Sequence, residues 1–281
     1  MKFTKMHGLG NDFIVVEDFA LTLKDYANLA IWLCNRNFGI GADGLALLQP
    51  SETGVCRILI FNSDGSEAEM CGNLIRCAGK YLDERGLVQE SVFDVEMFSA
   101  VKTLRLVVEE DEVVAVEVDM GEPILESDLV PVAGERRRVM QEEISAYGET
   151  FAMTAVSMGN PHCVIFVEDT ETVPLATWGP ALETHVIFPK KTNVEFVQIV
   201  TPSEARFRVW ERGAGPTLAC GSGACAVLVA GVLNAKLERK ATLHLPGGAL
   251  VVEWRDDNHL YMTGPAEEVF RGELVLSPEF L

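Results

Sequence analysis

The chain has 281 residues, 48% of them hydrophobic, which is enough for two domains that each bury a core. Its 42 acidic residues outnumber 23 basic ones, and the formal net charge of −19 argues against binding to nucleic acid or to an anionic membrane surface. Composition therefore favours a soluble protein that handles a small molecule, with no nucleic acid and no membrane as partner.

The first half of the chain alternates strand patterns with two helical patterns. Apolar runs and period-two alternation predict strands over 3–7, 13–17, 45–49, 57–61, 91–98, 104–109 and 113–119. An amphipathic pattern predicts a helix over 24–36. A second helix is expected to begin near Cys71 and to run to about Glu84, because Gly86 is a typical stop signal after a helix.

A segment rich in Pro, Glu and Arg, 122–138, separates this half from a similar second half. The strands predicted there are 152–157, 163–167, 194–199, 205–210, 242–245, 249–254 and 260–263, with a short helix before 194. A long helix is expected from Cys220 to about Leu237. It is apolar nearly all round, so strands must cover it on every side. The tail 267–276 alternates weakly and is expected to return to the first half as an extra strand.

The two halves resemble each other at one constant spacing. Three motifs of the first half, Gly10-Asn11, Asn62 and Cys71-Gly72-Asn73, correspond to Gly159-Asn160, Glu211 and Cys220-Gly221-Ser222, each time 149 residues later (220 − 71 = 149). A fixed spacing without gaps is typical of an internal duplication. We therefore predict two similar domains, 1–118 plus 266–281 and 119–265.

The predicted fold class is mixed α/β (α+β). Each domain is expected to be a curled, mostly antiparallel sheet wrapped around a central helix. The active site is expected in the cleft between the two domains.

Two cysteines stand where a loop becomes a helix. Cys71 follows the turn-rich segment 62–66, and Cys220 follows the glycine-rich segment 213–216. A helix start carries unpaired N–H groups and a partial positive charge, which favour a thiolate and can bind a carboxylate. Two such thiols on opposite faces of a carbon next to a carboxylate could invert it, one removing a proton and the other returning one.

The remaining cysteines, Cys34, Cys56, Cys77, Cys163 and Cys225, lie in apolar stretches and are interpreted as small buried hydrophobes. Their spacings match no usual zinc motif, the glycine-rich segments lack the rest of a nucleotide fingerprint, and no lysine has a recognisable pyridoxal phosphate context. We therefore expect neither a metal nor a cofactor. The absence of a signal-peptide pattern and the seven cysteines favour a cytoplasmic location.

Several long motifs give the chain a specific resemblance. They are His7-Gly8-Leu9-Gly10-Asn11-Asp12-Phe13, Glu69-Met70-Cys71-Gly72-Asn73 with Arg76-Cys77, Gly159-Asn160-Pro161-His162, and 211–213 with 219–225. In this order, and spread from residue 6 to about 265, they resemble the diaminopimelate epimerase family. The family resemblance implies a cofactor-independent enzyme, commonly a homodimer, that interconverts LL- and meso-diaminopimelate for lysine and peptidoglycan precursors.

The resemblance also implies roles for individual residues. Cys71 and Cys220 would be the paired acid and base. The residues that would bind the carboxylate at the reacting carbon are Gly72, Asn73, Gly221 and Ser222. The residues that would hold the rest of the substrate are Asn11, Asn62, Asn160, Asn193, Glu211 through its main chain, and Arg212. His162 would support a thiol, or would be a structural histidine.

Three positions depart from the family pattern: Gly44 stands where many members carry Gln, Leu74 replaces a Gly, and Pro216 replaces a Glu. Alternative hypotheses stay open. A proline or hydroxyproline racemase-like enzyme would use the same two thiols, although Asn73 stands where that group tends to have His. A thiol-disulfide redox protein would instead cycle a Cys71–Cys220 bond, and a non-catalytic amino-acid binding protein would need no thiol.

Overall fold

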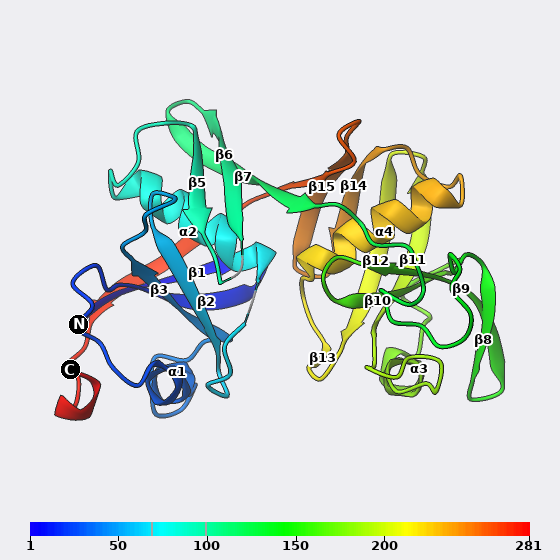
Figure 1. Ribbon diagram of the computed structural model, residues 1–281, viewed down its shortest axis with the longest axis horizontal. Coiled ribbons are helices and arrows are strands. Elements are labelled where there is room, and N and C mark those ends of the chain that lie inside the picture. The colour runs from blue at the N-terminus through cyan, green and yellow to red at the C-terminus, as the bar shows by residue number, and fades with distance from the viewer. Residues whose placement is uncertain (69, 99) are drawn as a thin grey trace. The chain divides into compact units, whose positions relative to one another are not determined.

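The computed structural model describes residues 1–68, 70–98 and 100–281. Glu69, part of the motif around Cys71, lies outside the described residues. The chain divides into two compact units, Met1–Val118 with Gly264–Leu281, and Asp119–Thr263. Each unit contains both helices and strands (Figure 1), which confirms the predicted mixed α/β class.

The first unit is built on a sheet in which most neighbouring strands are antiparallel. Its strands are β17 (Glu267–Glu273), β1 (Lys2–Gly8), β2 (Asn11–Glu17), β3 (Gly44–Gln49), β4 (Arg57–Asn62), β5 (Val92–Glu96), β6 (Val101–Glu109) and β7 (Glu112–Gly121), in this order of pairing. Among the pairs whose register is described for these strands, β2–β3 and β4–β5 are parallel. The pairing of β17 with β1 confirms that the tail returns to the first unit.

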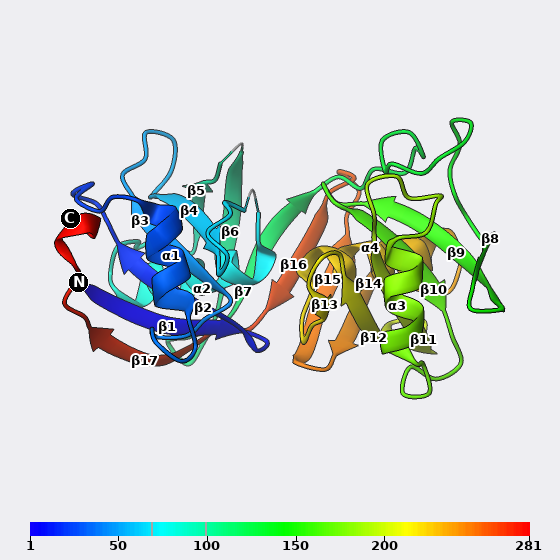
Figure 2. The same cartoon turned by 90° about the horizontal axis from the view of Figure 1, so that it is seen from below.

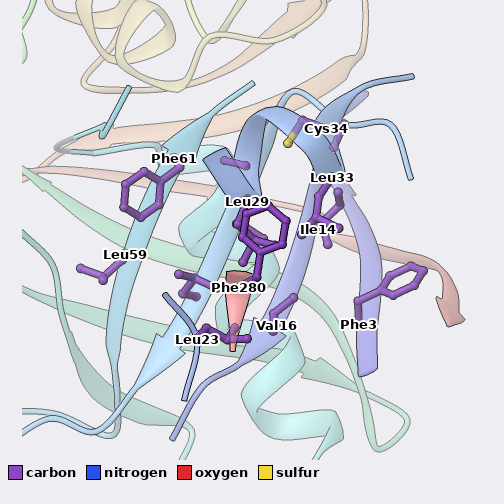
Figure 3. Packing of buried hydrophobic residues seen from close by; sticks show 14 of the residues in the cluster. Phe3, Ile14, Val16, Leu23, Leu29, Leu33, Cys34, Leu59, Phe61 and Phe280 are labelled. Carbon is purple, nitrogen blue, oxygen red and sulfur yellow. The ribbon is translucent and has the colours of Figure 1, made fainter. Parts of the chain in front are cut away.

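Two helices pack on this sheet. The longer one, α2 (Gly72–Glu84), packs against β1, β2, β6 and β17, whereas α1 (Tyr26–Cys34) packs against β3 and β4. Leu29 and Leu33 of α1 join the apolar residues of β2 in one buried cluster, together with Phe280 of the short C-terminal helix η1 (Pro278–Phe280). Figure 3 shows Phe280 among these side chains. Chain end and chain start therefore share one core.

The second unit repeats this plan. Its strands are β8 (Glu142–Ala146), β9 (Glu149–Ser157), β10 (Pro161–Phe166), β11 (Asn193–Thr201), β12 (Glu204–Glu211), β13 (Gly215–Pro216), β14 (Lys240–Leu245), β15 (Gly248–Trp254) and β16 (Leu260–Gly264). The parallel pairs are β10–β11 and β12–β14, and the others are antiparallel. Figure 2 shows α3 (Leu175–Glu183) beside β11 and β12, against which it packs.

The central helix of the second unit, α4 (Gly221–Leu233), packs against β9, β10, β11, β14 and β15. Every residue from Gly223 to Gly231 is buried, as expected for a helix without a polar face. Helices α2 and α4 have 13 residues each and begin directly after Cys71 and Cys220. The matching helices and the matching parallel pairs confirm the internal repeat.

Some boundaries differ from the sequence expectation. Helix α4 ends at Leu233, not near Leu237, because Ala235 takes the left-handed conformation with φ 53° and the chain turns back. A Cβ on Gly231 would lie 2.5 Å from the Leu237 side chain, so only a glycine permits this reversal. Strand β8 was not predicted. Among the described residues, no helix has the length and apolarity needed to cross a bilayer.

Candidate active site

Cys71 and Cys220 occupy equivalent backbone positions. Each is the N-terminal capping residue of its helix, with φ −143° and ψ 106° at Cys71 and φ −129° and ψ 107° at Cys220. The predicted location of both thiols at helix starts is thereby confirmed. Cys71 is half-buried, and Cys220 is only 6% exposed. Each thiol thus lies at the start of a helix, where the N–H groups of the first turn have no partner within the helix itself.

In the first unit, Asn11 connects Cys71 with the first turn of α2. The Oδ1 atom of Asn11 accepts a hydrogen bond of 3.0 Å from Nδ2 of Asn73, and the Sγ atom of Cys71 lies 3.8 Å from the same oxygen. Nδ2 of Asn11 donates to the carboxylate of Asp43 over 2.8 Å. Asp43 therefore orients the Asn11 carbonyl toward the thiol, a contribution that the sequence analysis missed.

A charged cluster holds this asparagine turn in place. Asp12 lies 2.7 Å from Nζ of Lys5 and accepts two hydrogen bonds from Arg36, which also bonds to Asp43. Burial opposes the charge on Asp12, but its bonds to Arg36 and Lys5 outweigh burial and hold its pKa well below the usual range. The loop that carries Asn11 is therefore fixed by charges of both signs.

The buried guanidinium of Arg76 stabilises the first turn of α2 through hydrogen bonds. Arg76 is fully buried and donates to the Gly72 carbonyl over 3.2 Å and to Oδ1 of Asn73 over 3.1 Å. These two residues were assigned to the substrate carboxylate from the resemblance. Arg76 leaves their backbone N–H groups untouched and fixes the Asn73 side chain toward Asn11.

Asn62 and Gly44 do not contact the thiol through any described hydrogen bond. Asn62 is exposed, and its amide donates to Ser66 within its own loop over 3.0 Å. Gly44 begins β3 opposite Asn62, and a Cβ at this position would lie 2.9 Å from the Phe61 carbonyl. A side chain at this position would therefore press against the backbone of β4.

In the second unit, a backbone N–H group and a hydroxyl group lie beside the sulfur of Cys220. The backbone N–H of Gly223 donates to Sγ over 3.3 Å, and Oγ of Ser222 lies 3.6 Å from Sγ. Ser222 in turn accepts a hydrogen bond of 3.2 Å from Nδ2 of Asn160. In both units, an asparagine side chain is hydrogen-bonded to the first turn of the helix. Asn11 accepts this hydrogen bond, whereas Asn160 donates it.

His162 lies behind Asn160 and has no exposed surface. Its Nε2 atom is 3.0 Å from Oδ1 of Asn160, and its Nδ1 atom is 2.7 Å from Oε1 of Glu195, which is also fully buried. Glu195 was not among the residues predicted for the site. A charged residue between Val194 and Phe196 in an apolar strand was the available signal, since buried carboxylates need a partner.

The pKa expected for a helix-start thiol is wrong at Cys220. Burial raises the pKa of Cys220 well above its ordinary value, and the negative charges of Glu211 and Glu195 raise it further. Hydrogen bonds from Ser222 and Gly223 lower it but do not compensate. In this structure Cys220 is therefore a thiol at neutral pH, suited to give a proton.

We predict that alkylation of Cys220 by iodoacetamide depends on pH accordingly. Only the thiolate reacts, so a raised pKa means that the reaction accelerates with pH mainly above about pH 9. Peptide mapping by mass spectrometry gives the rate at each pH. The urea-unfolded chain serves as control, because there the thiol titrates near its unperturbed pKa of about 8.5. A folded midpoint below the unfolded one would contradict the prediction.

Arg212, which follows β12, and Asn193, which begins β11, form a second group. Oδ1 of Asn193 accepts from the Arg212 backbone N–H over 2.9 Å, and its Nδ2 donates to the Pro161 carbonyl over 2.8 Å. Asn193 is buried and so uses its amide to hold two chain segments together. The Arg212 side chain is exposed and contacts only the Lys190 carbonyl over 3.3 Å among its described hydrogen bonds.

Glu211 lies close to Cys220. Burial raises the pKa of Glu211, while hydrogen bonds to Thr217 and to Cys220 lower it. The structure thus brings together Asn11, Cys71, Gly72 and Asn73 in one unit and Asn160, His162, Glu211, Cys220, Gly221 and Ser222 in the other. Asn62, Asn193 and Arg212 lie apart from these hydrogen-bonded groups.

The interpretation of the other five cysteines as buried hydrophobes is confirmed. None of them is more than 2% exposed: Cys34, Cys56, Cys77, Cys163 and Cys225. Burial raises the pKa of Cys56 and Cys77 to about 12. Within the described residues, no group of three His, Cys, Asp or Glu side chains is arranged to hold a metal ion.

Comparison with known sequences points to one family. A family model described as diaminopimelate epimerase matches residues 3–126 and 154–269. A diaminopimelate epimerase from Pelotomaculum thermopropionicum is 55% identical over 275 residues, covering 97% of this chain and 98% of its own. One from Desulfitobacterium hafniense is 53% identical over 278 residues and covers 98% of both chains.

Solved structures with low sequence identity share the fold. A PhzF-family phenazine biosynthesis protein from Bacillus anthracis has a TM-score of 0.73 at 14% identity, covering 98% of this chain and 99% of its own. A probable proline racemase from Agrobacterium radiobacter has a TM-score of 0.72 at 13% identity, covering 99% and 93%. These likenesses concern the fold alone.

Proposed function

The chain belongs to the diaminopimelate epimerase family, and from this premise we propose that Cys71 and Cys220 are the two catalytic thiols of its epimerase reaction. The reaction interconverts LL- and meso-2,6-diaminopimelate, which serves the formation of lysine and peptidoglycan precursors. The observation that carries the assignment of the thiols is their identical position, as capping residues of the two equivalent helices.

The two thiols act as base and acid in turn. One sulfur, as a thiolate, removes the α-hydrogen as a proton, and the electron pair of the C–H bond stays on the carbon. The other thiol then donates its proton to the opposite face, which inverts the centre and leaves that sulfur as the thiolate. The reverse reaction exchanges the two roles, so a duplicated scaffold suits it.

The helix starts stabilise the charge that develops during this step. The negative charge of the carbanion spreads onto the neighbouring carboxylate, and we assign this carboxylate to the backbone N–H groups at Gly72, Asn73, Gly221 and Ser222. The glycine after each cysteine leaves room for the substrate to reach these groups. The scheme needs no further electron sink and therefore no cofactor.

The distal end of the substrate is assigned to polar groups outside the two thiol clusters. Arg212 offers a planar guanidinium that can hold a carboxylate with two parallel hydrogen bonds. Its backbone position is fixed by Asn193, so the exposed side chain projects from a rigid point. The amides of Asn11, Asn62 and Asn160 and the main chain of Glu211 complete the proposed set.

The proposal includes the oligomeric state of the protein and its location in the cell. We assign a homodimer and a cytoplasmic location on the resemblance described above. Light scattering of the purified protein measures the mass of the assembly directly.

An assay of the purified chain on LL-diaminopimelate, without added metal or cofactor, tests the function. We expect conversion to a mixture of LL and meso isomers, with incorporation of solvent deuterium at the α-carbon. L-proline and hydroxyproline serve as competing substrates. Inversion of these, with no turnover of diaminopimelate, would contradict the proposed function and favour the racemase-like alternative.

A further inference from the structure

A chain of hydrogen bonds leads from a buried carboxylate to the sulfur of Cys220. Glu195 Oε1 lies 2.7 Å from His162 Nδ1, and His162 Nε2 lies 3.0 Å from Asn160 Oδ1. Asn160 Nδ2 donates to Ser222 Oγ over 3.2 Å, and Ser222 Oγ lies 3.6 Å from Cys220 Sγ. All five residues belong to the second unit.

The atoms of this chain determine the direction of its hydrogen bonds. Oδ1 of Asn160 can only accept, so Nε2 of His162 must carry a hydrogen and donate it. The 2.7 Å contact between Nδ1 and Oε1 excludes two facing lone pairs, so a second proton lies between His162 and Glu195. The buried pair therefore holds two protons, which is possible because the carboxylate balances the charge of the ring.

The same direction continues to the sulfur. Ser222 accepts from Asn160, which leaves the Ser222 hydroxyl hydrogen free to point elsewhere, and Cys220 Sγ lies within reach. We propose that Glu195 is a positioning residue that acts through His162, Asn160 and Ser222 to direct a hydroxyl hydrogen toward the Cys220 sulfur, and so stabilises the Cys220 thiolate. This inference deepens the two-thiol function and rests on Cys220 being a thiolate in one half of that reaction.

The packing around these hydrogen-bonded residues indicates that Glu195 has a specific role beside Cys220. Glu195 and His162 are both completely buried, and Oε2 of Glu195 has no hydrogen-bond partner among the described residues. A Cβ on Gly223 would lie 3.0 Å from Glu195 Oε1 and 3.1 Å from Cys220 Sγ. Only the absence of a side chain at Gly223 lets the carboxylate and the thiol share this space. A carboxylate placed there solely to fill a core would lose its hydration without any gain in return.

Glu195 acts on the pKa of Cys220 in two opposite ways. Its negative charge raises this pKa, whereas the proposed hydrogen-bond chain lowers it, so the two effects can be measured separately. The charged groups that face Cys220 are Glu211 from β12 and Glu195 from β11, and both raise the pKa of the thiol, whereas Ser222 and Gly223 lower it through hydrogen bonds. His162 from β10 contacts Glu195 and also acts on Glu211. Loss of the Glu195 charge alone would thus ease thiolate formation, while loss of the hydrogen-bond direction would hinder it.

The variant Glu195→Gln separates these effects, because glutamine has the shape of glutamate but cannot balance a charged ring. The neutral ring then carries one hydrogen; when the amide oxygen of the variant side chain faces it, that hydrogen lies on Nδ1, Nε2 turns from donor to acceptor, and the Asn160 amide reverses. Ser222 then donates to Asn160, not to Cys220. We expect the pH midpoint of Cys220 alkylation to move upward, with about tenfold slower alkylation at a fixed pH below that midpoint.

The measurement compares iodoacetamide alkylation of Cys220 in four full-length variants by peptide mapping. Ser222→Ala removes the last link alone, and we expect about the same tenfold slowing from it. The double variant Glu195→Gln/Ser222→Ala should be no slower than Ser222→Ala, because both changes act through one chain. The control is Glu204→Gln, which removes the carboxylate from a partly exposed pair with His244, 2.8 Å apart in the same unit, and should leave the midpoint unchanged.

Wild-type alkylation in Ser222→Ala would overturn the inference whatever the midpoint of Glu195→Gln, as would additive slowing in the double variant. If Glu195→Gln does not fold, Ser222→Ala decides alone, and wild-type alkylation in it would equally overturn the inference. In the epimerase assay we expect kcat of Glu195→Gln to fall about tenfold with KM within about threefold. A wild-type protein that shows the alkylation pattern but no epimerisation would refute the proposed function and leave the role of Glu195 standing.

Discussion

Replacing either Cys71 or Cys220 with alanine is expected to lower kcat for epimerisation by about 10³–10⁴-fold, near the upper end of what a positioned acid or base contributes. Each variant loses the group that serves one face of the α-carbon, so neither direction of the reaction can finish. KM should change much less, because the N–H groups at each helix start remain. Circular dichroism of the isomerisation mixture and amino-acid analysis give the rates.

The matched control is Cys56→Ala. Cys56 is buried in the first unit, and burial raises its pKa to about 12, so it has no thiolate to offer near neutral pH. We expect its kcat within about threefold of wild type and a modest loss of stability, about 1 kcal/mol for one lost buried group. Wild-type inversion in Cys71→Ala or in Cys220→Ala would reject the two-base scheme.

Arg212→Ala is expected to raise KM for LL-diaminopimelate by about 10²-fold, and Arg212→Lys by about tenfold. Two charge-assisted hydrogen bonds to the distal carboxylate are lost in the first variant, each worth about 1.5–3 kcal/mol before solvent weakens them. Lysine keeps the charge but not the planar fork. Because the distal carboxylate does not react, the effect should appear in KM far more than in kcat.

Arg206→Ala provides the comparison for this prediction. Arg206 is an exposed arginine on the same strand, β12, and it has no proposed contact with the substrate. Steady-state kinetics of the three variants at constant ionic strength separate a specific contact from a change in net charge. If Arg212→Ala and Arg206→Ala had equal KM values, Arg212 would have been assigned wrongly.

The repeat and both helix starts could be predicted because their signals are local. A glycine-rich loop followed by an apolar run specifies a loop-to-helix transition wherever it occurs, and a constant spacing reports a duplication without knowledge of the fold. The end of α4 was harder to place, since Asn234 is a common residue just after a helix but Ala235, which takes the left-handed conformation, is the strongest helix former. The chain leaves the helix there because Leu237 packs onto Gly231, a tertiary contact.

The chemical character of the site depends on long-range contacts that no motif records. The pKa of Cys220 was expected to fall from the helix start alone, yet burial and two glutamates from neighbouring strands reverse the effect. Glu195 and Asp43 escaped notice because their partners, His162 and Asn11, lie 33 and 32 residues away in sequence. Asn193 shows the converse, since its amide is occupied by backbone groups.

A crystal structure with LL-diaminopimelate bound tests the two-thiol mechanism most directly. The mechanism requires the Sγ atoms of Cys71 and Cys220 to lie on opposite faces of one α-carbon. Each sulfur should be about 3–3.5 Å from that α-carbon, as is usual for atoms about to react. A ligand with only one sulfur near its stereocentre, or with both sulfurs on the same face, would contradict it.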